Sequence, residues 1–148
     1  MRYANEMAPV VSSTLAADLR VAVMKLARRL RQQLSADDIS TGQFSVLAAL
    51  ATRGPRTPRE LADIERVQPP SMTRTLTYLV EAGLVTRAAH PEDGRQVLIA
   101  ITDRGSDVVQ ETRRRRTAWL AQRLAELTPD ERAVLKEASS IVLRLAES

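Results

Sequence analysis

The chain has 148 residues, of which 44% are hydrophobic and 27% charged, a balance that is ordinary for one soluble globular domain and argues against disorder of the whole chain. It contains no cysteine and a single histidine, which excludes disulfides, thiol chemistry, cysteine-based zinc sites and a histidine-rich metal site. The net charge of +4, carried almost entirely by arginine, permits a polyanionic partner without requiring one.

The first predicted element is an amphipathic helix of about five turns that begins after the run Ser12 to Thr14. Its apolar residues recur every three or four positions, which places them on one helical face. They are Leu15, Leu19, Ala22, Leu26, Leu30 and Leu34. Residues 35–40 then indicate a polar break.

Two short helices follow, each with a recognisable end. The first spans about 42–52 and is ended by Gly54, which can adopt a left-handed cap before Pro55. The second spans about 58–66 and begins with Thr57 as its N-cap, with Glu60 reaching back. Their apolar faces carry Phe44, Leu47, Leu50, Leu61 and Ala62.

A third helix begins in the turn 67–71. Pro69 and Pro70 fit the first turn of a helix, where their missing N–H groups matter least, and Gly83 ends the helix. Met72, Leu76, Leu79 and Val80 are expected to point inward. The opposite face is polar and carries Ser71, Thr73, Arg74 and Thr77.

The hydrophobic period then changes from that of a helix to that of a strand. Residues 84–87 and 96–101 are rich in β-branched side chains and predict two strands. Residues 88–95 between them contain Asp93 and Gly94, a pair that favours positive φ and indicates the tip of a hairpin.

Two long helices complete the chain. Thr102 and Asp103 cap the first, which extends to about Leu127, and a second Thr-Pro-x-Glu box at Thr128 opens the last. One face of the last helix carries Val134, Ala138, Ile141, Val142 and Leu145. The order α-α-α-α-β-β-α-α predicts a mainly α fold with a two-stranded β wing, a winged helix-turn-helix at about 40–102 between long helices.

Within this frame the chain resembles the MarR family of bacterial transcription regulators. The resemblance rests on a set of motifs whose order and spacing are specific together, although each alone is weak. They are Thr57-Pro58-Arg59-Glu60-Leu61-Ala62, Pro70-Ser71-Met72-Thr73-Arg74, Leu79-Val80-Glu81-Ala82-Gly83-Leu84-Val85-Thr86-Arg87, Asp93-Gly94-Arg95 and Ile101-Thr102-Asp103-Arg104-Gly105. The Pro69-Pro70 pair departs from the family's usual pattern.

The resemblance implies a homodimer on a pseudo-palindromic operator, with dimerisation helices at 1–39 and 103–148 joined to the DNA-binding domain in one compact chain. The predicted DNA contacts are Pro70, Ser71, Thr73, Arg74, Thr77 and Arg95. Hydroxyls and free N–H groups at the start of the recognition helix can meet phosphates, and an arginine can instead read guanine. By composition alone, the polar residues of the recognition helix are also what any solvated helix face shows; they are Ser71, Thr73, Arg74 and Thr77.

The wing prediction has its own alternative. A hairpin turn needs Gly94 and tolerates Asp93, but it does not need Arg95, which can enter a narrow minor groove. By family analogy Asp93 restrains that arginine. His90 is interpreted as a solvated loop residue, with a phosphate contact as the alternative.

Positive charge is not concentrated in the predicted DNA-binding region. Between residues 53 and 95 the seven arginines exceed the six acidic residues by only one, so affinity must depend on where the arginines point. Four consecutive arginines at 113–116 lie mid-helix, where successive side chains point around the axis. We interpret this tract as a solvated, salt-bridged segment that can add long-range positive potential.

The terminal helices carry more apolar surface than a small winged domain can cover alone, so a twofold dimer is expected to bury it. The predicted dimer contacts are Leu15, Leu19, Leu135, Ile141 and Leu145. The family also suggests a small anionic aromatic effector, with Arg87 as charge partner and Phe44 as wall. The alternative places Phe44 in the core and Arg87 in a structural ion pair.

These observations predict a cytoplasmic DNA-binding transcription regulator, expected to be a repressor, without catalytic activity, cofactor, metal or membrane segment. No stretch approaches the roughly 18 apolar residues of a membrane helix. The competing interpretation is a winged-helix dimerisation module without DNA binding. A small hydrolytic enzyme is disfavoured because the chain has one histidine and no carboxylate cluster with metal spacing.

Overall fold

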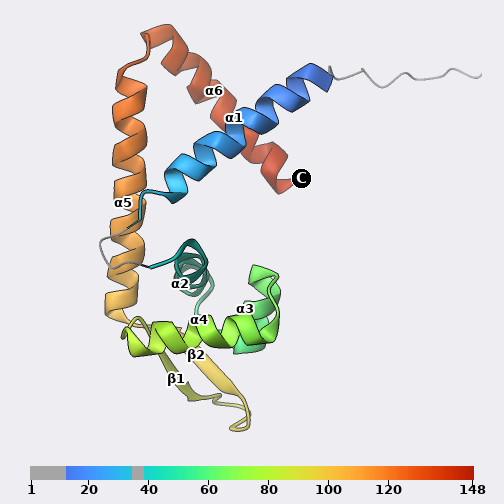
Figure 1. Ribbon diagram of the computed structural model, residues 1–148, viewed down its shortest axis with the longest axis vertical. Helices are drawn as coiled ribbons and strands as arrows, with labels where there is room; N and C mark the ends of the chain where they lie inside the picture. Colours follow the sequence, from blue (N-terminus) through green and yellow to red (C-terminus); the bar gives the residue numbers. More distant parts are fainter. Residues whose placement is uncertain (1–12, 35–38) are drawn as a thin grey trace, which may run out of the picture. The chain divides into compact units, whose positions relative to one another are not determined.

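The computed structural model describes residues 13–34 and 39–148, and it confirms the predicted fold class (Figure 1). The described part contains six helices and one two-stranded antiparallel sheet. The elements are α1 (Ser13–Arg31), α2 (Thr41–Arg53), α3 (Pro58–Glu65), α4 (Pro69–Glu81), β1 (Val85–Ala89), β2 (Val97–Ile101), α5 (Asp103–Ala125) and α6 (Pro129–Glu147). The helix α1 belongs to one compact unit, and residues 33–148 form another.

Most helix ends follow from local capping. Thr57, Thr102 and Thr128 accept N–H bonds at the starts of α3, α5 and α6, as expected for N-caps. At α3, however, the Glu60 carboxylate receives the Thr57 hydroxyl at 3.2 Å, whereas the prediction had Glu60 reaching back to close the box. A complete capping box that the sequence analysis did not identify joins Ser40 and Gln43 at the start of α2.

The hydrophobic core of the larger unit lies between α2, α3, α4, the sheet and the first half of α5. Its fully enclosed side chains include Leu47, Leu50, Leu61, Met72, Leu76, Leu79, Leu84, Ile99 and Val109. Two positions correct the prediction for the segment before α2. Leu34 lies beyond the end of α1 and packs against this core, and Ile39, placed in a polar break, is 2% exposed and belongs to it.

The wing is a short hairpin whose register pairs Val85 with Ile101 and Ala89 with Val97. Its first strand begins one residue later and ends two residues later than predicted. Arg56 extends the sheet by one bridge, since its N–H donates to the Ile99 carbonyl at 3.0 Å and its carbonyl accepts from the Ile99 N–H at 2.8 Å. The wing is therefore attached to the segment that precedes α3.

Thr102 forms a corner between the end of α4, the wing and α5. Its hydroxyl donates to the Gly83 carbonyl at 2.7 Å and accepts the Gly105 N–H at 3.1 Å. Its own N–H donates to the Leu84 carbonyl at 3.0 Å. Gly105 allows this close approach, because a Cβ added there would lie 2.2 Å from the Leu84 carbonyl oxygen.

The helix α6 has no buried residue, and its position relative to α5 is stabilised by Arg132. The Arg132 guanidinium donates from Nη1 to three carbonyls at the end of α5, those of Leu124, Ala125 and Leu127, at 3.2, 3.5 and 2.8 Å. Carbonyls in the last turn of a helix have few intrahelical partners, although that of Leu124 also accepts the Leu127 N–H at 3.2 Å. The positive guanidinium is in addition attracted to the negative end of the helix dipole. No helix of the described part is both long and apolar enough to cross a membrane.

The packing at Gly105 predicts a specific stability defect. Replacing Gly105 with Ala should lower the free energy of unfolding by about 1–3 kcal/mol, because the Leu84 backbone must move to make room. Gly42→Ala is the matched control, since its added Cβ would meet no atom closer than the Ser40 Oγ at 4.0 Å. Urea denaturation followed by circular dichroism checks both variants. An unchanged midpoint for Gly105→Ala would contradict the packing argument.

Candidate nucleic-acid interface

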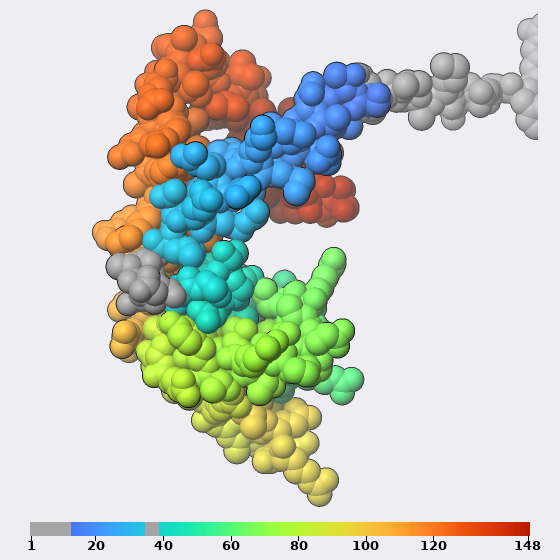
Figure 2. Space-filling view, in the orientation of Figure 1, coloured from blue at the N-terminus to red at the C-terminus, as the bar shows by residue number. Residues whose placement is uncertain are grey.

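The helix α4 presents one buried face and one polar, solvent-exposed face. Met72, Leu76 and Leu79 are buried, whereas Thr73, Arg74, Thr77 and Tyr78 are exposed and Ser71 is half-buried. Five of the six predicted DNA contacts, Pro70, Ser71, Thr73, Arg74 and Thr77, therefore share this helix. In the space-filling view α4 (light green) and the wing (yellow) lie next to each other on the face turned to the viewer (Figure 2).

The hydroxyl protons of the two threonines on this face are already used within the helix. Thr73 Oγ1 donates to the Pro69 carbonyl at 3.0 Å, and Thr77 Oγ1 donates to the Thr73 carbonyl at 2.9 Å. Arg74 reaches only the Ser71 hydroxyl, at 3.5 Å, and has no carboxylate within ion-pair distance in the described residues. Arg74 is therefore the strongest hydrogen-bond donor that this face offers to a DNA base or phosphate.

The first turn of α4 corrects the expectation of free N–H groups. Pro69 and Pro70 have no N–H, and the next two N–H groups, those of Ser71 and Met72, both donate to the Gln68 carbonyl at 3.0 and 3.2 Å. Main-chain donors that ordinarily bind phosphate at a helix start are thus absent or occupied here. Contacts to the DNA backbone must come from side chains.

The wing tip is ordered by local hydrogen bonds. Asp93 Oδ1 accepts the backbone N–H of Arg95 at 3.1 Å, and the Asp93 carbonyl accepts the Gln96 N–H at 3.0 Å. Asp93 thus positions Arg95 through the backbone, and no ion pair joins their side chains. Gly94 does not have positive φ, contrary to the prediction. The imidazole of His90 has a local structural role as well, since its Nδ1 accepts the Glu92 N–H at 3.2 Å.

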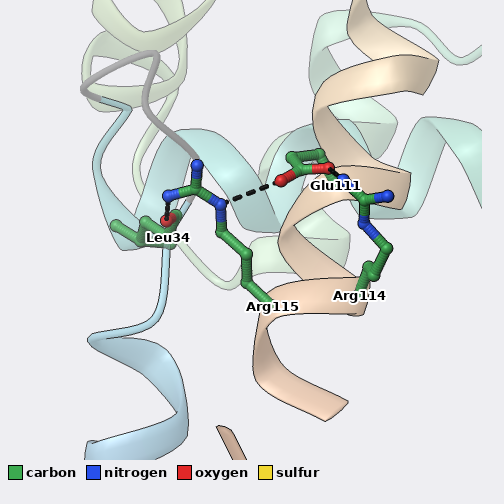
Figure 3. A network of polar contacts seen from close by, with 4 residues as sticks. All are labelled: Leu34, Glu111, Arg114 and Arg115. Carbon is green, nitrogen blue, oxygen red and sulfur yellow. Dashed lines mark hydrogen bonds and ion pairs between the residues drawn. The ribbon is translucent and has the colours of Figure 1, made fainter. Parts of the chain in front are cut away.

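The arginine tract on α5 is salt-bridged, as predicted, and part of it joins α5 to other segments. Glu111 binds both Arg114 and Arg115, and Arg115 also donates to the Leu34 carbonyl at 3.3 Å (Figure 3). The hydrogen bond from Arg115 is the main reason that the pKa of Glu111 lies below its ordinary value. Arg114 and Arg115 are therefore engaged in a structural network around Glu111.

The two residues proposed for a ligand site have different environments. Phe44 is 6% exposed within the core, and the Arg116 guanidinium carbon lies 4.4 Å from the centre of its ring. This agrees with the alternative that Phe44 is a core residue, and its role as a ligand wall stays a prediction. Arg87 is exposed on β1 and has no ion pair in the described residues, so the structural ion pair is not observed.

A cleft of about 750 Å³ lies between α3 and the start of α4, and the sequence analysis did not identify it. Arg59 and Arg66 line it from α3 and its C-cap, with Asp63 between them, and Thr73 lines it from α4. Arg66 has φ 54° and ψ 45°, a left-handed conformation that costs roughly 1–2 kcal/mol for a residue other than Gly. The sequence did offer one indication of this charged cleft, since Arg59, Asp63 and Arg66 are spaced to lie on one helical face.

Comparison with known proteins agrees with this geometry. Residues 39–97 match the model of the MarR family. An HTH-type transcriptional regulator of Mycobacterium tuberculosis is 47% identical over 90% of this chain and 93% of its own. The crystal structure of MarR from Escherichia coli is 31% identical, covers 94% of this chain and 99% of its own, and has a TM-score of 0.73. The chain belongs to the MarR family.

Membership makes this protein a DNA-binding transcription regulator with a winged helix-turn-helix. At the level of the fold alone, a MepR variant of Staphylococcus aureus, bound to an oligodeoxyribonucleotide, is 19% identical with a TM-score of 0.69 and covers 89% of this chain and 97% of its own. The described residues contain no group of three or more histidine and acidic side chains placed to hold a metal ion.

Proposed function

We propose that this MarR-family regulator acts as a homodimeric repressor on a pseudo-palindromic operator. The main support is that the polar face of α4 and the wing that bears Arg95 lie on one side of the winged domain. The hydrogen bonds of Thr102 hold the two to each other. Two copies related by a twofold axis would place the recognition helices in successive major grooves and the wings at the flanking minor grooves.

Arg74 and Arg95 are proposed to make different kinds of contact. Arg74→Ala should cost about 1–3 kcal/mol on the operator and relax the preference for one base in each half-site, because an arginine can bind guanine through two hydrogen bonds. Arg95→Ala should weaken binding more evenly across sequences. It should also lower the salt slope, the steepness with which the logarithm of affinity falls with the logarithm of salt concentration, by about one unit per subunit. The remaining preference should be for A·T-rich sequences with narrow minor grooves.

Binding curves at several salt concentrations, on an operator selected from genomic DNA and on a scrambled duplex, separate these roles. An equal loss for Arg74→Ala on both duplexes would make Arg74 a phosphate contact and disprove base readout by it. A wild-type protein that bound neither duplex would favour the alternative of a winged-helix module without DNA binding.

Apolar side chains on the terminal helices support the dimer. On α6, Leu135, Ile141 and Leu145 are 45%, 49% and 59% exposed, and on α1 Leu15 and Leu19 are also exposed. Neither helix buries any residue within the single chain. A second copy of the chain would remove this surface from water, at about 25 cal/mol for each Å² of apolar area.

The dimer is tested by placing a charge on α6. Ile141→Asp should weaken association by several kcal/mol, because an unpaired carboxylate would be buried in an apolar interface. Sedimentation velocity of wild type and variant at micromolar concentration measures this effect. Ser140→Asp, one position away at an exposed hydroxyl, serves as the control for added charge. A monomeric wild type at these concentrations rules the dimer out.

We further propose that an anionic aromatic effector releases the regulator from DNA, with Arg87 as its charge partner. Support comes from the uncompensated charge of Arg87 on β1 and from the family resemblance. Phe44 is buried in the core, so the proposal rests on Arg87 and not on Phe44. Such an effector must bind the DNA-incompetent state more tightly than the DNA-bound state.

Titration of salicylate-like compounds into a preformed DNA complex tests the effector proposal. Release of DNA by wild type at millimolar ligand, together with a loss of this response in Arg87→Gln, is the expected result. Retention of the complex throughout the titration counts against the proposal.

A further inference from the structure

The two arginines of the cleft between α3 and α4 belong neither to the recognition face nor to the wing, and both occupy positions where the local backbone disfavours an arginine. Arg59 occupies the first turn of α3, where its positive charge is repelled by the positive end of the helix dipole. Arg66 closes α3 in the left-handed conformation, a position that glycine or asparagine occupies at lower cost. Departures from local rules of this kind concentrate at functional sites.

The charges of the cleft are not compensated by ion pairs. Arg59 and Arg66 are both exposed, and neither has a carboxylate within 4.0 Å in the described residues. Asp63 lies on the same face of α3 between them and is likewise exposed and unpaired. The cleft therefore carries one net positive charge. The long side chains of Arg59 and Arg66 can reach one anion from either side of Asp63.

The cleft is continuous with the recognition face. Thr73 belongs to both, and Pro69, which also lines the cleft, is exposed at the start of α4. When α4 lies in a major groove, one DNA strand borders that groove alongside the helix, and the preceding helix crosses it. The first turn of α4 offers this strand no free N–H group, because of its two prolines and the bonds to the Gln68 carbonyl.

From this arrangement we propose that Arg59 and Arg66 clamp a backbone phosphate of the operator strand that passes through the α3–α4 cleft. The two guanidinium groups replace the main-chain donors that the proline pair removes from the start of the recognition helix. Asp63 opposes the phosphate and limits the strength of the contact. The inference rests on DNA binding by this face, which is the proposed function.

Arg66→Gly is the sharpest test, because its predicted effects on stability and on binding have opposite signs. The variant should unfold at the same temperature as wild type or higher, since glycine accepts the left-handed conformation. It should bind operator and scrambled duplex about tenfold more weakly, by a similar factor on both, as expected for a lost charge-assisted contact. Its salt slope should fall by about one unit per subunit.

Three further variants isolate the phosphate contact. Arg59→Ala should behave like Arg66→Gly in binding and should also keep or raise the unfolding temperature. Asp63→Asn should tighten binding on both duplexes, because it removes the opposing charge. Arg113→Ala, an exposed arginine of α5 that lies outside the cleft, is the matched control and should leave the salt slope nearly unchanged.

The outcomes distinguish the clamp from the proposed function itself. Unchanged affinity and slope for Arg66→Gly, with a wild type that binds DNA, overturns the clamp and leaves the function standing. A loss for Arg66→Gly on the operator alone also overturns it, because that result indicates base readout. If the wild type shows no salt-dependent DNA binding, the proposed function itself is wrong, and the clamp proposal, which rests on it, is wrong as well.

Discussion

The geometry of the DNA-binding domain depends on the corner at Thr102. Its side-chain oxygen links the Gly83 carbonyl to the Gly105 N–H, and its backbone N–H is bonded to the Leu84 carbonyl. The end of α4, both wing strands and the start of α5 therefore meet at one residue. Since Gly105 leaves no room for a side chain against Leu84, these segments are in contact along their backbones. The separation between Arg74 on α4 and Arg95 on the wing follows from this corner.

Arginine carries nearly all the positive charge of the chain. Many of these arginines can be sorted into two groups according to the groups that they contact. Arg114 and Arg115 bind Glu111, and Arg132 satisfies the carbonyls at the end of α5. These arginines are structural, because each binds a carboxylate or a backbone carbonyl of the folded chain that would otherwise bind water. Arg59, Arg66, Arg74, Arg87 and Arg95 project from the winged domain without ion pairs among the described residues. The distinction depends on position and not on residue type, and a count of charges does not reveal it.

Local signals in the sequence were sufficient for the order of the elements and for most of their ends. Thr57, Thr102 and Thr128 define helix starts through short-range hydrogen bonds, and a glycine at 54 defines a helix end through its positive φ. The errors arose where tertiary packing overrides local preference. Ile39 is drawn into the core from a polar segment, and Leu34 continues an apolar period after its helix has ended. Neither outcome is encoded in the neighbouring residues.

The recognition face shows the same division. The exposed side of α4 followed from its helical period, so Ser71, Thr73, Arg74 and Thr77 were found together. The intrahelical use of the threonine protons and the backbone role of Asp93 were not predictable, because each depends on a rotamer or a turn geometry. The α3–α4 cleft depends on the angle between two helices, which the sequence period does not report.

The proline pair at the start of α4 also affects the entropy of recognition. Each ring fixes one backbone dihedral in the unfolded and unbound chain alike, so the first turn of the helix has fewer conformations to lose. A recognition helix that frays in solution must be ordered when it enters the groove, and that ordering is subtracted from the binding free energy. In this chain the two prolines restrict the backbone of the helix start before DNA arrives. At this end of α4, adjustment to the operator therefore falls more to the side chains than to the backbone of the first turn.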